Sequence, residues 1–115
     1  MSIMKVDYGD VGGGMELVDS AYVTNWNGLS ITGLTSGKSY MLIIAYGFSN
    51  GNYPISNFTF SNTTDVTDVE TSDVNSYSYI YWNSKTFTFK ATGTSTTIGN
   101  TSGGIPGRYW LFELP

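Results

Sequence analysis

Large apolar side chains alternate with polar ones in several short segments of the chain. Phe58 and Phe60 flank a threonine, and so do Phe87 and Phe89. Such a period of two places every second side chain on the same face of a β-strand. Residues 39–46 form instead a nearly continuous apolar run bounded by glycines, which is typical of a strand buried on both faces.

Turn residues separate these segments at short and regular intervals, and no segment keeps a helical period over ten residues. Eight segments have strand character: 16–23, 29–32, 39–46, 57–61, 66–71, 76–82, 86–90 and 108–114. Residues 83–85 look like a hairpin turn, and residues 92–104 are predicted to be a loop or a weak edge strand. The predicted fold class is all-β, an antiparallel β-sandwich of jelly-roll type with about eight or nine short strands.

The glycine run at residues 12–14 divides the chain into two unequal parts. Three consecutive glycines are costly to order, which predicts a joint. We therefore expect residues 1–14 to be an N-terminal arm with a glycine joint, and residues 15–115 to be the β-sandwich domain. A disordered terminus is the alternative.

Composition then excludes several classes of function. The chain has no His and no Cys, so it lacks the usual residues for acid–base, thiolate and zinc chemistry. Its net charge is −4, and its five Lys and Arg residues are scattered singly, which argues against a nucleic-acid partner. No apolar run is long enough to span a membrane, and the N-terminus lacks the apolar core of a secretory signal. We expect no cofactor and no enzymatic activity.

Three tyrosines are the first candidate binding residues. Tyr77, Tyr79 and Tyr81 would share one face of the predicted strand 76–82, with Ile80 and Trp82 on the core side. A row of outward tyrosines suits a partner subunit or, as a second choice, a sugar ring. Packing under another loop, or plain strand preference, would explain them equally well.

A second candidate is the acidic segment 65–73, which contains Asp65, Asp68, Glu70 and Asp73. Oxygen ligands of this kind suit Ca²⁺, but the spacing does not match a calcium-binding loop. In a strand, Asp68 and Glu70 would share a face that Asp65 opposes. We therefore interpret the segment as a charged edge strand that discourages aggregation, and we expect no metal site.

The loop around residues 49–54 supplies the remaining candidates. Asn50, Asn52 and Tyr53 could hydrogen-bond sugar hydroxyls, although they are also ordinary turn residues.

Residues 29–40, with a strand, a Gly33-Leu34 turn and Tyr40, resemble the corner of a fibronectin type III domain. The match covers about twelve residues and comes much earlier in the chain than in that family. A corner of the same kind in another β-sandwich is therefore the better expectation.

The glycine joint, the richness in Ser, Thr, Asn and Gly, and the compact β body together resemble small structural proteins of tailed phages. The likeness is to fibre tips, head fibres and capsid decoration proteins, and it extends over the whole chain without a diagnostic motif. It implies a homo-oligomer, typically a trimer, that binds a host glycan or the virion surface.

These considerations predict a non-enzymatic virion module that assembles with itself, contacts other virion proteins through its N-terminal arm, and has a host-surface glycan as a candidate ligand. The expected location is the virion, after synthesis in the host cytoplasm. The alternative is a free-standing carbohydrate-binding or adhesin-like module. A carboxylate-dependent hydrolase is a third and weaker reading.

Overall fold

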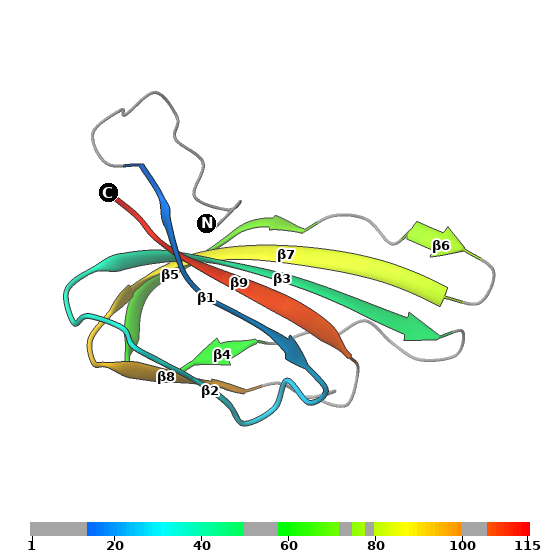
Figure 1. Cartoon of the computed structure of the whole chain (residues 1–115), viewed down its shortest axis with the longest axis horizontal. Helices are drawn as coiled ribbons and strands as arrows, with labels where there is room; N and C mark the ends of the chain where they lie inside the picture. The colour runs from blue at the N-terminus through cyan, green and yellow to red at the C-terminus, as the bar shows by residue number, and fades with distance from the viewer. Residues whose placement is uncertain (1–13, 50–57, 72–74, 78–79, 100–105) are drawn as a thin grey trace.

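The computed structural model describes residues 14–49, 58–71, 75–77, 80–99 and 106–115, and these residues contain strands and no helix (Figure 1). The described strands are β1 (Glu16–Val23), β2 (Leu29–Thr32), β3 (Ser39–Ser49), β4 (Thr59–Phe60), β5 (Thr63–Thr71), β6 (Asn75–Tyr77), β7 (Ile80–Ala91), β8 (Ser95–Gly99) and β9 (Gly107–Glu113). The predicted all-β class is therefore confirmed. The predicted arm, residues 1–14, lies outside the described residues except for Gly14.

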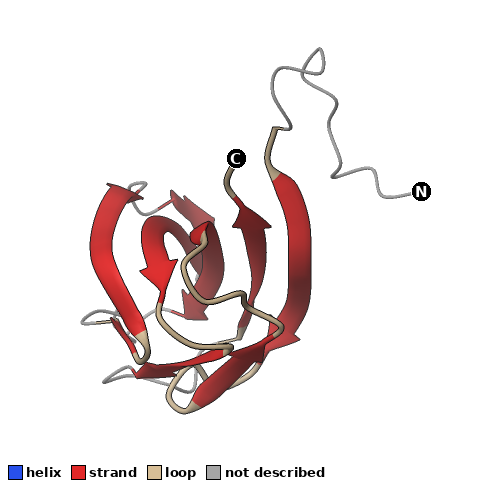
Figure 2. Cartoon of the chain, turned by 90° about the vertical axis from the view of Figure 1, so that its left-hand side faces the viewer, coloured by secondary structure: helices blue, strands red, loops and turns tan. Residues whose placement is uncertain are grey.

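The strands form two antiparallel sheets packed as a sandwich. The large sheet has the order β1-β9-β3-β7-β5, with β6 also paired to β7, and the small sheet has the order β2-β8-β4. In the large sheet, β9 thus lies between β1 and β3. In the small sheet, β8 lies between β2 and β4. This is the strand order of a jelly roll. Figure 2 shows the two sheets from one end, enclosing a common interior.

One strand departs from that order. A jelly roll would place the strand after β4 at the edge of the small sheet, but β5 pairs with β7 and extends the large sheet instead. The small sheet consequently covers only part of the large sheet, and β3 and β7 extend past it toward β6 (Figure 1).

Two predictions are wrong in the region of the tyrosines, one of a continuous strand and one of a hairpin turn. The expected strand 76–82 is not continuous, because β6 ends at Tyr77 and β7 begins at Ile80, with Tyr77 paired to Ile80 and Ser76 to Tyr81. The expected hairpin at 83–85 lies inside β7, which continues to Ala91. Its full pairing with β3, from Ser49–Ile80 to Ser39–Lys90, holds this stretch extended.

Residues 92–99, the described part of the predicted segment 92–104, also differ from the prediction. β8 is the central strand of the small sheet, not a weak edge strand or a loop. Ile98 and Thr96 are fully buried, and each lies opposite a residue of β2. Only Ile98 is large and apolar in this segment. The alternation of apolar and polar residues was therefore too weak to predict a buried strand.

Aromatic rings fill the interior between the sheets. Phe87 and Phe89 point inward as predicted and are 6% and 2% exposed. Phe60, on the opposing sheet, lies with its ring centroid 5.1 Å from Phe87 and 5.8 Å from Phe89. Further contacts continue this aromatic line to Tyr40 at one end and, through Phe58, to Trp26 at the other.

Tyr40 forms the predicted corner. Its side chain is fully buried, and the backbone N–H of Thr35 donates a hydrogen bond of 2.7 Å to its hydroxyl. A tyrosine that bonds back to the backbone a few residues upstream ties a loop to the strand that follows it. Leu34 is buried beside this turn, and its N–H bonds to Thr94 of the opposite connection. The corner thus occurs here in a jelly-roll arrangement.

We expect Tyr40→Phe to lower the free energy of unfolding by about 1 kcal/mol, because the Thr35 N–H loses a protein partner while the ring stays buried. Urea unfolding measures the change. Tyr22→Phe is the matched control, since Tyr22 is 63% exposed and should change stability by less than about 0.5 kcal/mol. Equal effects of the two substitutions would contradict a role for the Tyr40 hydroxyl.

Both edges of the large sheet are interrupted by bulges. The register of β1 shifts between Leu17 and Asp19, and that of β5 shifts between Thr64 and Thr67 and again between Asp68 and Glu70. The valines at these shifts are exposed: Val18 by 38%, Val66 by 46% and Val69 by 56%. Bulges at sheet edges discourage a further strand from pairing there.

Candidate binding site on the outer face of the large sheet

The sequence-predicted binding residues fall where side chains are not described. Asn50, Asn52, Tyr53 and Tyr79 lie outside the described residues, and for Tyr77 and Tyr81 only the backbone is described. The tyrosine row assumed one unbroken strand, and that assumption is wrong because Tyr77 and Tyr81 belong to different strands. A binding role for these residues stays a prediction, but a shared strand face no longer supports it.

The acidic segment is an edge strand, as interpreted from the sequence, but its geometry is less regular. Bulges replace the simple alternation of Asp65, Asp68 and Glu70, and Asp65 has a positive φ of 55°. The Asp68 carboxylate lies 3.6 Å from the Lys85 ammonium. Among the residues that the structure describes, no three carboxylates gather where they could hold a metal ion.

Calcium should therefore leave the protein unchanged. We expect the melting temperature to be the same with a chelator and with added Ca²⁺, because an ion stabilises a fold only by binding its native state. A stabilisation that grows with Ca²⁺ concentration would contradict this prediction.

The structure places a different group of side chains together, on the face of the large sheet that points away from the small sheet. A hollow of about 310 Å³ lies where β1, β9 and β3 run side by side. Its described lining residues are Tyr22, Ala45, Pro106, Gly107, Arg108 and Trp110. We call this hollow the outer pocket.

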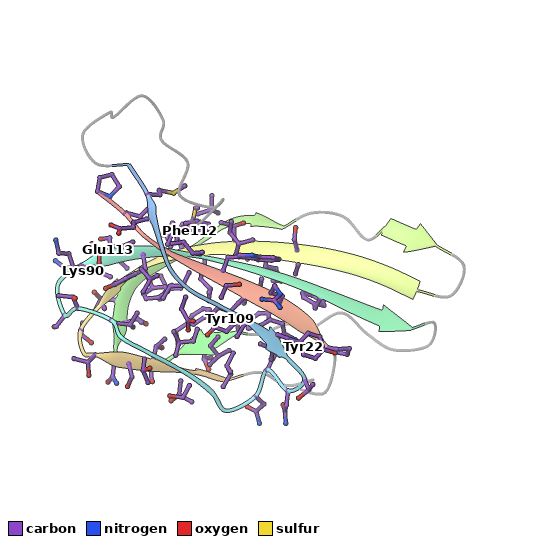
Figure 3. The ribbon with its side chains drawn as sticks, viewed as in Figure 1. Tyr22, Lys90, Tyr109, Phe112 and Glu113 are labelled. Carbon is purple, nitrogen blue, oxygen red and sulfur yellow. The ribbon has the colours of Figure 1, made fainter. Side chains whose placement is uncertain are left out.

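Strand register explains why these residues meet. Arg108 of β9 lies opposite Tyr22 of β1 on one side and Ala45 of β3 on the other. Residues paired across neighbouring strands share a face, and Trp110 joins them because it is two residues further along β9. Figure 3 shows Tyr22 near the end of β1.

Arg108 gives the outer pocket its charge. Its side chain is exposed, and one guanidinium nitrogen donates a hydrogen bond of 3.2 Å to the Ser20 hydroxyl. A guanidinium has five N–H donors, so most of them are left to other partners or to water. Of the described lining residues, Arg108 alone is charged. The pocket thus combines two aromatic side chains with a cationic donor.

Beyond the pocket, the same face continues as an apolar surface. Leu17, Met41 and Ile43 are partly exposed there, and Phe112 is 5% exposed. Register connects them, since Phe112 lies between Leu17 and Met41, and Trp110 lies beside Ile43. We call Leu17, Met41, Ile43 and Phe112 the outer apolar surface, and Trp110 lies between it and the outer pocket.

This surface corrects the prediction that residues 39–46 are buried on both faces. Tyr40, Leu42, Ile44 and Tyr46 are fully buried beneath the small sheet. The alternate residues Met41, Ile43 and Ala45 are only partly buried, because the small sheet covers the opposite face.

A partly buried polar pair lies at the β1 edge, where Tyr109 points inward. The Tyr109 hydroxyl donates a hydrogen bond to the Asp19 carboxylate, which also accepts the Ser20 N–H at 2.9 Å. The pKa of Tyr109 is raised above its ordinary value of 10.0, first by burial, then by the hydrogen bond to Asp19 and by the charge of that carboxylate. A phenol with a raised pKa stays protonated at neutral pH. The pair therefore holds β1 against β9 as a neutral donor and an acceptor.

The raised pKa predicts a loss of stability in alkali. The folded state favours the protonated phenol, so its contribution is complete below about pH 10 and is lost as pH rises from there toward the folded-state pKa. We expect unfolding in urea to show wild type losing more stability than Tyr109→Phe between about pH 8 and pH 11. At pH 8 the variant should be less stable by about 1–2 kcal/mol, because Asp19 loses a donor. Parallel pH profiles would show that Tyr109 does not titrate with unfolding.

Sequence reasoning missed the outer pocket. In residues 108–114 both sets of alternate side chains are large, since Tyr109 and Leu111 alternate with Trp110 and Phe112. The pattern therefore predicts a strand but does not tell which face is inward. The one usable signal was Arg108 at a strand position two residues before a tryptophan.

The chain matches no protein family, no curated protein and no solved structure with which it was compared. Within the described part of the chain, no helix is long and apolar enough to cross a membrane.

Proposed function

We propose that this chain is a non-enzymatic module of a phage virion, of the fibre-tip or capsid-decoration type. It assembles with copies of itself, contacts other virion proteins through residues 1–14, and recognises a surface glycan. The strand order supports this proposal, because jelly rolls are common in viral capsid proteins and in lectins.

The main support for self-assembly is the outer apolar surface. Met41 and Ile43 belong to the most apolar run of the chain, yet they are only partly buried, on the face that points away from the small sheet. Only 12% of all residues are charged, so the surface as a whole has few groups that keep monomers apart. A second copy that packs against this face would bury it.

The edges of the large sheet are poorly suited to strand pairing with a second copy, which favours packing of that copy against the face of the sheet. Bulges interrupt β1 and β5, and Asp68 adds a charge along β5. Continuous strand pairing between copies is thereby disfavoured. A second copy would therefore pack against the outer apolar surface rather than extend the large sheet.

Sedimentation equilibrium tests the assembly. We expect a mass that is a multiple of 12.5 kDa, and we expect Ile43→Lys to give a folded monomer, because a buried unpaired charge is costly in an interface. Val66→Lys is the matched control, since Val66 is exposed on the β5 edge and away from this face. A monomeric wild type, or an Ile43→Lys variant that keeps the full mass, would contradict the proposal.

A free-standing carbohydrate-binding module is the second candidate. The outer pocket favours it, because Tyr22 and Trp110 together with Arg108 offer both ring surfaces and a hydrogen-bond donor in one hollow. A stable monomer that binds saccharide would favour this candidate over the virion module.

A further inference from the structure

We infer that the outer pocket binds a carboxylated saccharide, with Arg108 holding the carboxylate and Tyr22 and Trp110 contacting the sugar ring. This inference rests on the glycan-binding part of the proposed function and names the ligand class. Arg108 and Trp110 come from β9 and Tyr22 comes from β1, and the register holds these two strands side by side.

The size of the pocket limits the ligand to a small unit. Its volume of about 310 Å³ is at the lower end of the range of about 300–1,000 Å³ seen for ligand pockets. It therefore suits one ring with its substituents. Two flat aromatic side chains at one hollow suit the apolar face of a sugar ring.

Local charge selects the acidic sugar. Arg108 is flanked in register by Tyr22 and Ala45, and its hydrogen-bond partner Ser20 is neutral. The nearby acid Asp19 is bound to Tyr109, which points into the core. The guanidinium thus meets no carboxylate among the lining residues.

The geometry of arginine favours a carboxylate over a hydroxyl. Its planar fork can donate two parallel hydrogen bonds to the two oxygens of a carboxylate. The bond to Ser20 is made by one terminal nitrogen, and it orients the guanidinium without using all of its donors. The overall charge of −4 acts weakly at a distance, because physiological salt screens charges beyond about 8 Å.

A comparison of matched sugars tests the inference by titration calorimetry on the full chain. The probes are the methyl glycosides of glucuronic acid and glucose, and of galacturonic acid and galactose. We expect each acid to bind about tenfold or more tightly than its neutral parent, a difference of about 1.4 kcal/mol. The preference should fall as salt is raised.

Variants assign the roles. Arg108→Gln should remove the preference for the acid while leaving the neutral sugar within about twofold, and Tyr22→Ala should weaken both sugars by about fivefold. Lys90→Gln is the matched control, because it removes the same charge from the exposed end of β7. Lys90 pairs with Ser39, six residues along β3 from Ala45, or about 20 Å away. Figure 3 shows Lys90 and Tyr22 toward opposite ends of the sheet.

The possible failures are distinguishable. Equal binding of acid and neutral sugar, unaffected by Arg108→Gln, would overturn the acidic class while glycan binding and assembly stand. Absence of sugar binding, with Arg108→Gln dissociating the oligomer, would overturn the inference and make the pocket a contact between copies. Absence of sugar binding in a monomer would overturn both the inference and the proposed function.

Discussion

Gly107→Ala should cause a large loss of stability, because an added methyl group there has no room. A Cβ at Gly107 would lie 2.2 Å from the Ala45 carbonyl oxygen, 2.8 Å from Trp26 Cζ2 and 2.9 Å from the Tyr46 Cα. Two of these atoms are backbone of β3 and cannot rotate away. Strand β9 lies between β1 and β3, so it cannot shift without disturbing both pairings. We expect a cost of about 3 kcal/mol or more in urea unfolding.

Gly93→Ala is the control for that substitution. The nearest atom to an added Cβ there is Asn62 Cβ at 3.4 Å, which is an ordinary contact. We expect a change of less than about 1 kcal/mol. A double variant gives a sharper test, because Trp26→Ala removes one of the three contacts but leaves the two backbone contacts. If Gly107→Ala caused no further loss of stability in the Trp26→Ala background, the clash with β3 would be excluded as the cause.

Trp26→Ala should have the second large effect. Trp26 is fully buried, and its ring packs edge-on against Phe58 at a centroid distance of 6.3 Å. It ends the aromatic line that joins the two sheets. Truncation of a buried tryptophan costs about 3–5 kcal/mol, which is a large part of the 5–15 kcal/mol typical of a domain.

The same chemistry at an exposed position provides the comparison. Tyr22→Ala also removes an aromatic ring, but Tyr22 is 63% exposed, so we expect a cost below about 1 kcal/mol. Melting temperature and urea midpoint should rank the two variants in this order. Similar costs for the two would mean that Trp26 does not anchor the core.

The fold was predictable where one face of a strand is clearly more apolar than the other. The alternation around Phe87 and Phe89 identified the inward face of β7, and the turn before Tyr40 identified the corner. The β-sandwich followed from the number and spacing of the strands, whereas the strand order had no local signal in the sequence. The departure of β5 had none either, because pairing with β7 depends on contacts between distant segments that no local pattern records.

The candidate site was less predictable for a related reason. Sequence spacing identifies residues that share a strand face only if the strand is continuous, and the break between Tyr77 and Ile80 removed that condition. The outer pocket requires Tyr22 and Arg108, which are 86 positions apart in the sequence and adjacent in register. Such a pair has no local signature.

The position of β9 has a consequence for how the chain acquires its structure. This strand is the last in sequence among those described, yet it fills the space between β1 and β3, and Ala21 must find Tyr109 across most of the chain. Pairings between distant segments slow folding, because the loop must close before the contacts can form. During synthesis, the large sheet cannot close until residues 107–113 have left the ribosome. Until then, the apolar strand β3 lacks one of its two neighbours, so the large sheet should form only after β9 has been synthesised.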